Sequence, residues 1–131
     1  PMRYQGNRAL LYLYRPRCLR RDLTNDLATE VLSGAGYQGK SCEQCVARLM
    51  HRLREGQEFP HEVGLFLSYP PEDVKGFIDN KAENFKCAGL WKVYGDEKRA
   101  RELFARYKRC TDIYCALWRA GSSIEQLAVP V

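Results

Sequence analysis

Two cysteines with a CxxC spacing offer the most direct chemistry in this sequence. Cys42 and Cys45 follow Ser41, where a helix is expected to begin. Backbone amides and the helix dipole stabilise a thiolate at such a position, which would suit thiol redox chemistry. Both cysteines also continue an apolar stripe with Val46 and Leu49, and free cysteine often packs as a small buried hydrophobe. We therefore favour packing over redox chemistry for this candidate thiol pair.

A zinc site is a weaker alternative for the same pair. Two more ligands would have to come from the remaining histidines and cysteines in separate elements, namely His51, His61, Cys87, Cys110 and Cys115. The sequence holds only one CxxC pair, and residues five apart on a helix project in different directions. The spacing therefore predicts no metal site and no cofactor.

A second set of reactive residues surrounds His61. His61 and Glu62 could act as general base and acid, with Lys92 and Tyr94 as partners. The segment HEVGL lacks the second histidine of an HExxH zinc site, and adjacent helical side chains point about 100° apart. These observations favour a capping or core-edge role for His61, and whether the protein is an enzyme stays open.

Arginine and lysine residues gather in two stretches, around 15–21 and 98–109. The candidate contacts for a polyanion are Arg17, Arg20, Arg21, Arg99, Arg106 and Arg109. The formal net charge of +5 comes from 21 Lys and Arg against 16 Asp and Glu, which is modest for electrostatically driven binding. Nucleic-acid binding is therefore possible but not favoured, and it would require the two clusters to form one surface.

The stretch 60–78 imitates a helix-turn-helix motif. Apolar residues occupy the expected packing positions, and Gly64 is small enough for a helix crossing. The second helix, however, begins with Pro71, Glu72 and Asp73, whereas a recognition helix needs donors for phosphates and base edges. The motif is more consistent with a packing unit than with a DNA reader.

The elements that would position these residues are mostly helices. Apolar residues at three- and four-residue spacing predict helices over 17–32, with a possible break at 24–26, over 42–53, 59–68 and 70–78, and from Asp96 to Trp118. Ser41 with Gln44 matches a capping box, Asp96 can cap the last helix, and Gly121 can close it. Residues 122–127 could add a short turn.

Two apolar segments rich in β-branched or aromatic residues predict strands. They are the run Arg8 to Arg15, with its centre at Leu10 to Tyr14, and Leu90 to Tyr94. We expect an α+β fold in which five or six helices pack on one small antiparallel sheet containing both strands. The first strand, apolar on both faces, is expected to be covered.

Length and composition indicate one domain over residues 1–131. With 45% hydrophobic and 28% charged residues, the chain is ordinary for a globular protein. No apolar run approaches the ~20 residues of a membrane helix, and no signal pattern begins the chain. We expect reduced cysteines in a cytoplasm. A short sheet with an open edge or aromatic patch would favour a homodimer.

The stretch 59–74, with Gly76, Phe77 and Ile78, resembles an uncharacterised bacterial family known as domain of unknown function 3793. The resemblance continues through Leu11, Tyr12, Tyr14, Arg15 and Pro16, through Gly89 and 91–94, and through Phe104, Tyr107 and Cys110. It implies an intact fold and a bacterial cytoplasmic origin but no reaction.

Two departures accompany this resemblance. Family members usually carry glycine where this chain has Ser68, and usually have a further N-terminal segment with a cysteine motif, so we expect a shortened version.

The favoured function is a binding or regulatory module. Its candidate functional surface consists of His61, Glu62, Trp91, Lys92 and Tyr94. The alternatives are a thiol redox or small-molecule enzyme and a nucleic-acid-binding protein.

Overall fold

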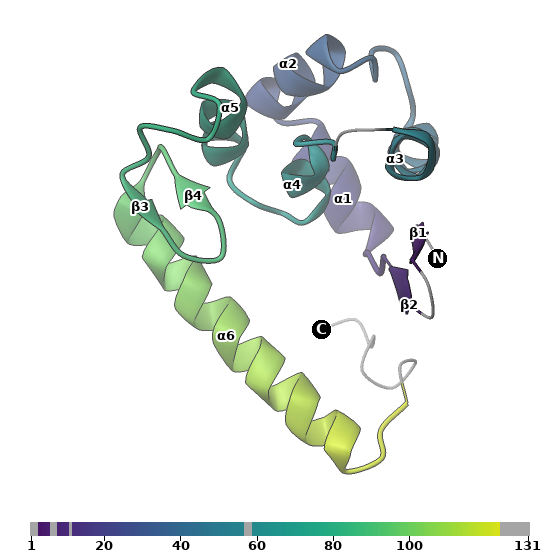
Figure 1. The fold of residues 1–131 in the computed structure, drawn as a ribbon, viewed down its shortest axis with the longest axis vertical. Helices are drawn as coiled ribbons and strands as arrows, with labels where there is room; N and C mark the ends of the chain where they lie inside the picture. The colour runs from purple at the N-terminus through teal and green to yellow at the C-terminus, as the bar shows by residue number, and fades with distance from the viewer. Residues whose placement is uncertain (1–2, 6–7, 11, 57–58, 124–131) are drawn as a thin grey trace.

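The computed structural model describes residues 3–5, 8–10, 12–56 and 59–123, and these are mostly helical (Figure 1). The six helices within those ranges are α1 (Pro16–Leu23), α2 (Asp26–Gly34), α3 (Cys42–Glu55), α4 (Val63–Phe66), α5 (Pro71–Asp79) and α6 (Glu97–Arg119). The strands are β1 (Arg3–Gln5), β2 (Arg8–Leu10), β3 (Cys87–Ala88) and β4 (Lys92–Val93). The predicted α+β class is confirmed.

Helix boundaries follow the local signals in the sequence. The possible break at 24–26 is confirmed, because the Asn25 side chain accepts hydrogen bonds from the amides of Leu27 and Ala28 and starts α2. The Ser41 and Gln44 capping box is formed at α3. The Asp96 side chain likewise caps α6 by accepting from the Arg99 amide.

The prediction of one sheet containing both strands is wrong. β1 pairs antiparallel with β2, and β3 pairs antiparallel with β4, so the described residues form two separate two-stranded sheets. Each strand pairs with its neighbour in the chain because closing a short turn costs less conformational entropy than closing a loop of about eighty residues. The strand predicted at Leu90 to Tyr94 shortens to Lys92–Val93.

The covered strand predicted at Leu10 to Tyr14 is also corrected. Only Arg8–Leu10 is a strand, Leu11 lies outside the described residues, and 12–15 have no regular structure. This segment is held by side chains instead: the Tyr12 hydroxyl donates to the Phe66 carbonyl, and the rings of Tyr12 and Tyr14 stack at 5.0 Å. Leu13 is exposed, so its side chain is not covered as the sequence had predicted.

The helix predicted over 59–68 is limited to the single turn of α4, since Ser68 ends it with a φ of +62°. The Tyr69 amide donates back to the Gly64 carbonyl, as in a Schellman motif. This left-handed position explains why glycine suits it. As predicted, Gly64 lies at a close crossing, where an added Cβ would stand 2.8 Å from Val74 Cγ2.

Substitutions at Ser68 should separate backbone strain from hydrogen bonding. The Ser68 hydroxyl donates to Asp22 Oδ2 at 2.6 Å, so Ser68→Ala loses this bond, keeps the left-handed strain and should cost about 1 kcal/mol. Ser68→Gly loses the same bond but relieves roughly 1 kcal/mol of strain, which leaves stability near the wild-type value. Urea denaturation measures the unfolding free energy of both variants. Equal losses in Ser68→Ala and Ser68→Gly would show that the left-handed backbone of Ser68 is not strained.

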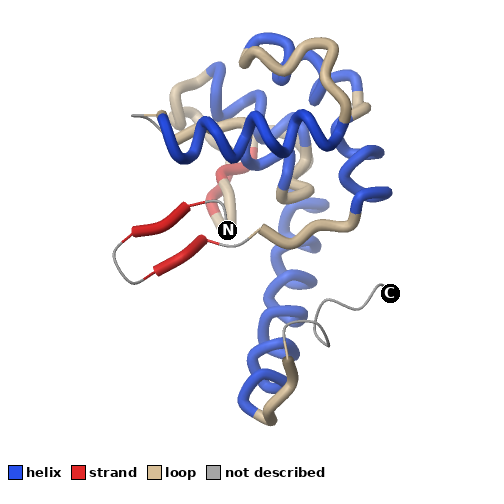
Figure 2. Tube along the Cα trace, turned by 90° about the vertical axis from the view of Figure 1, so that its right-hand side faces the viewer, coloured by secondary structure: helices blue, strands red, loops and turns tan. Residues whose placement is uncertain are grey.

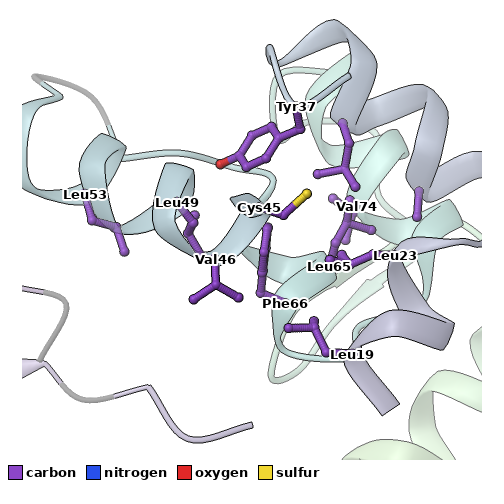
Figure 3. Close-up of a cluster of buried hydrophobic side chains, with 12 residues drawn as sticks. Leu19, Leu23, Tyr37, Cys45, Val46, Leu49, Leu53, Leu65, Phe66 and Val74 are labelled. Atoms are coloured by element: carbon purple, nitrogen blue, oxygen red, sulfur yellow. The ribbon is translucent and has the colours of Figure 1, made fainter. Parts of the chain in front are cut away.

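The main core lies among α1 to α5. Figure 3 shows Leu49 and Val46 of α3 facing Phe66 of α4, with the ring of Tyr37 closing one side. Leu49 is fully buried, and Tyr37 and Phe66 are nearly so. α2 also packs on α5, and α1 packs on α4, whose residues Gly64, Leu65 and Phe66 are buried.

A second, smaller cluster joins the β3–β4 hairpin to the start of α6. Trp91, Val93 and Ala100 are buried there, and Phe104 and Tyr107 pack against them. Beyond Tyr107, α6 extends away from the other helices for about three further turns (Figures 1 and 2). The predicted turn at 122–127 is not helical at 122–123, and 124–127 lie outside the described residues.

Candidate functional site

A buried carboxylate positions the β3–β4 hairpin against α5. Asp73 is only 2% exposed, and its Oδ2 accepts from the Trp91 indole N–H at 2.8 Å. Its Oδ1 accepts from the backbone amides of Tyr94 and Gly95 at 2.9 and 2.8 Å. Three donors thus hold one carboxylate, and Asp73 fixes both the ring of Trp91 and the turn after β4.

Trp91 is the centre of an aromatic stack. Its ring lies 4.4 Å from the ring of Tyr69 in a stacked arrangement and 4.5 Å from Phe104 at a near-perpendicular angle. Gly89 allows the close approach of α6, because a Cβ at this position would stand 2.4 Å from the Phe104 ring. The stack makes one wall of a hollow between α4, α5 and the hairpin.

This hollow, which we call the aromatic pocket, has a volume of about 520 Å³. Its walls include the side chains of Phe59, His61, Val63, Tyr69, Phe77, Leu90, Trp91 and Lys92. The rings of His61 and Phe77 lie 5.1 Å apart, and the Lys92 ammonium lies 4.8 Å from the centre of the Phe85 ring. The pocket therefore combines aromatic rings with two nitrogen-bearing side chains.

The structure brings together three of the five residues of the predicted surface. His61, Trp91 and Lys92 line the aromatic pocket. Tyr94 packs its ring over Gly76 and donates its hydroxyl to the Glu83 carbonyl, so it supports the hairpin from outside the pocket. The Lys92 ammonium donates to the Ala82 carbonyl at 2.8 Å, which holds it in place.

Glu62 points in the opposite direction from His61, into the core. It is 3% exposed, lies 3.0 Å from Arg52 Nη1 and accepts from the Tyr37 hydroxyl at 2.9 Å. Arg52 also donates to the Ala35 carbonyl, so this carboxylate ties α3 and the loop after α2 to the start of α4. The role this geometry gives Glu62 is structural.

The candidate thiol pair has an environment that opposes thiolate chemistry. Cys45 is buried in the main core, Cys42 packs against it, and burial raises the pKa of both thiols. The thiols of the described cysteines are free, with no disulfide among them. Reaction as a nucleophile requires a thiolate, so this environment favours the packing interpretation.

Two features are absent from residues 3–5, 8–10, 12–56 and 59–123. In those ranges, no group of three or more His, Cys, Asp or Glu side chains could hold a metal ion. Nor is any helix within them long and apolar enough to cross a membrane.

A larger groove, with a volume of about 800 Å³, lies between the N-terminal end of α1, the turn after α4 and the middle of α6. Among its lining residues are Arg15, Arg21 and Arg106. Arg21 and Arg106 belong to the two basic clusters of the sequence, which therefore meet here. The other four candidate contacts lie outside the groove and are exposed: Arg17, Arg20, Arg99 and Arg109. Arg20 pairs with Glu43 at 3.0 Å.

The helix-turn-helix resemblance does not extend to the geometry of a DNA reader. α4 is four residues long, and Asp73 of α5 is buried rather than presented outward. The pair α4 and α5 instead packs closely at Gly64 and supports one side of the aromatic pocket. The packing interpretation of this motif agrees with these contacts.

Comparison with known proteins places the chain in a family. The model of the family described as "Protein of unknown function (DUF3793)" matches residues 1–128. The chain belongs to this family. No curated protein and no solved structure matched it. The expected family resemblance is thus confirmed over nearly the whole chain of this DUF3793 protein.

Alkaline pH should destabilise this DUF3793 protein through its buried tyrosines. Burial raises the pKa of Tyr37, and the Glu62 carboxylate raises it further. Above about pH 10 the unfolded chain loses the phenolic proton while folded Tyr37 keeps it, so stability is complete below pH 10 and falls as pH rises. The slope approaches 1.4 kcal/mol per pH unit for one fully buried phenol, a value of about RT ln 10.

Urea denaturation between pH 8 and 11.5 measures this slope. Tyr37→Phe provides the comparison, because it removes the ionisable group and should flatten the alkaline decline. Burial also raises the pKa of Tyr12, Tyr69 and Tyr107, so part of the slope should remain in this variant. An unchanged slope would show that Tyr37 does not contribute.

The homodimer expected from the sequence stays a prediction for this DUF3793 protein. The distal part of α6 presents an apolar group in which Ile113 and Trp118 are both 57% exposed, with Tyr114 and Leu117 beside them. Patches of this kind often mark association surfaces. Sedimentation equilibrium should show concentration-dependent dimers that Leu117→Glu removes, and a monomer at every accessible concentration would contradict the expectation.

Proposed function

We propose that this protein is a binding module, and that the aromatic pocket holds a small, mainly apolar ligand with an anionic group. The observation that carries the proposal is the meeting of His61, Trp91 and Lys92 in one pocket of about 520 Å³. This volume falls within the range typical of ligand sites, which are largely apolar with a few polar groups. The bacterial cytoplasmic setting inferred from the sequence stays a prediction.

The pocket's chemistry favours a planar ligand. Tyr69, Phe77 and Trp91 contribute aromatic rings to its lining, while Phe59 and Leu90 are exposed at its margin. Aromatic rings gain from stacked or edge contacts with a further ring. A planar apolar group in the pocket would also cover the exposed margin.

Two nitrogen-bearing side chains support the choice of an anionic group. Lys92 presents an ammonium with three N–H donors, one of which meets the Ala82 carbonyl, and the exposed imidazole of His61 lines the same pocket. Asp73 also lines the pocket, but its two oxygens accept from three N–H groups. A carboxylate or sulfonate on the ligand would thus meet cationic or hydrogen-bonding groups.

The enzyme alternative has one supporting observation. His61 and Lys92 share a pocket, which is the arrangement that a small-molecule enzyme would require. The Lys92 ammonium and the Asp73 carboxylate, however, are both engaged in hydrogen bonds that hold the pocket together. Because these groups are already hydrogen-bonded, the pocket is better suited to hold a ligand than to transfer protons.

The dye 8-anilinonaphthalene-1-sulfonate is a suitable probe, since it combines planar rings with one anion. In a ¹H–¹⁵N correlation spectrum it should shift the Trp91 indole signal and the amides of 59–63 and 88–92. Lys92→Gln should weaken binding about tenfold, and Leu90→Ala several-fold.

Matched controls exist for both substitutions. Lys98→Gln removes the same charge from an exposed site on α6, and Ile113→Ala truncates an apolar side chain as exposed as Leu90. Neither should alter the shifts at Trp91. Perturbations confined to 113–118, or equal weakening by test and control variants, would overturn the proposal.

A further inference from the structure

We propose that the groove between α1 and α6 binds single-stranded nucleic acid. This site is separate from the aromatic pocket, and the proposal does not depend on the function assigned to that pocket. Its starting point is that three arginines line one groove of about 800 Å³: Arg15 and Arg21, at the start and within α1, and Arg106 of α6.

The charge of the groove is of one sign. Among the described residues that line it, the ionised side chains at neutral pH are these arginines, and none is a carboxylate. The nearby Asp22 accepts from the Ser68 hydroxyl at 2.6 Å and lies 3.7 Å from Arg21 Nε, so the charges of Asp22 and Arg21 partly offset each other. Three arginines against this one carboxylate still leave the groove positive. Guanidinium groups suit phosphates because of their planar arrangement of donors.

The same groove is rich in aromatic rings. Tyr12, Tyr14, Tyr107 and Tyr114 line it together with Phe66. Tyr12 and Tyr14 stack at 5.0 Å with an interplanar angle of 17°, and Tyr14 is the more exposed member of the pair. Because the Tyr12 hydroxyl is anchored on the Phe66 carbonyl, this two-ring platform is preformed.

Basic groups interleaved with rings favour single-stranded nucleic acid over other anions. Its phosphates can meet the arginines while its unstacked bases continue a stack on tyrosine. An acidic peptide would use the charges but not the ring faces. A bilayer would need a protruding apolar face, whereas these rings lie along a concave surface. A duplex would keep its bases stacked away from the tyrosines.

The test uses fluorescence anisotropy of fluorescein-labelled dT12 with the full chain. Arg21→Glu combined with Arg106→Glu should weaken binding more than tenfold at 50 mM salt. It should also reduce the slope of log K against log salt by about 1.4, because each single-strand phosphate contact contributes about 0.7. Lys81→Glu with Lys98→Glu makes the same charge change on exposed residues outside the groove and should have a much smaller effect.

Ring substitutions test the stacking part of the proposal. Tyr14→Leu and Tyr114→Leu should each weaken dT12 binding by at least about fivefold with little change in the salt slope. Phe59→Leu, in the aromatic pocket, is the control and should bind normally. Circular dichroism verifies that each variant keeps its helical content.

Several outcomes would overturn the proposal. One is a failure of dT12 to bind at 50 mM salt, and another is tighter binding of a 12-base-pair duplex. Equal losses in the groove and control charge variants would show nonspecific attraction only. Binding of phosphatidylglycerol vesicles, but not of dT12, that is lost in the Arg21 and Arg106 variant would assign the groove to a membrane surface instead.

Discussion

Asp73→Ala should lower the free energy of unfolding by about 3–5 kcal/mol, a large share of the roughly 5–15 kcal/mol typical of a domain. The substitution removes the acceptor for the Trp91 indole and for the amides of Tyr94 and Gly95. Each donor left buried without a partner costs about 1–3 kcal/mol. Urea denaturation followed by far-ultraviolet circular dichroism gives the value directly.

The variant Asp73→Asn should have an unfolding free energy between those of the wild type and Asp73→Ala. Its amide oxygen can still accept from the two backbone amides, but its NH₂ group would face the Trp91 N–H, donor against donor. Asp79→Ala is the control, since this carboxylate is exposed and pairs with Lys75 one turn away. Its stability should stay close to wild type. A loss below about 1 kcal/mol for Asp73→Ala would mean that the hairpin is not anchored through this carboxylate.

Glu62→Ala should be the second most damaging of the substitutions considered, with a loss of about 2–4 kcal/mol. It leaves the Tyr37 hydroxyl buried without its acceptor and removes the counter-charge of Arg52. The loss is smaller than for Asp73 because Arg52 keeps the Ala35 carbonyl as a partner and is partly exposed to water. Urea denaturation at pH 7 measures it.

The chain contains a closely matched control for Glu62. Glu43 pairs with Arg20 at the same 3.0 Å as Glu62 with Arg52, but both partners are exposed to solvent. Glu43→Ala should therefore leave the unfolding free energy close to wild type. If both glutamate substitutions had equal effects, burial would not be the source of the contribution from Glu62.

Local features of the fold were predictable from the sequence because they depend on neighbours in the chain. Asn25, Ser41 and Asp96 cap helices through amides two or three residues away, and Pro71 occupies a first helical turn. Each signal works within one turn of helix. The placement of these helices therefore followed from short sequence windows.

Non-local features were not predictable in this way. Whether an apolar segment becomes a strand depends on the presence of a neighbouring strand. The segment 12–15 is held instead by the hydroxyl bond of Tyr12 and by the stacking of Tyr12 on Tyr14. The burial of Asp73 depends on Trp91, eighteen residues away. The periodic pattern placed this aspartate among outward acidic groups, because no local signal distinguishes a buried acid from an exposed one.

The candidate site was only partly predictable for the same reason. The family resemblance singled out His61, Trp91 and Lys92, and the structure brings them together. It also singled out Glu62, which faces the core next to Tyr37. The sequence shows both basic clusters, but it could not predict the groove, because Arg21 and Arg106 are far apart in the chain and meet only in the fold.

The projecting half of α6 has a consequence for hydrogen exchange. Amides up to about Tyr107 belong to a helix packed on Trp91 and Val93, and they should exchange only through large openings. Those beyond it rely largely on the helix's own bonds, and a helix segment of this length is marginal in water. They should exchange through local fraying at rates insensitive to mild denaturant. Protection gained there on adding a partner would map what covers this half of the helix.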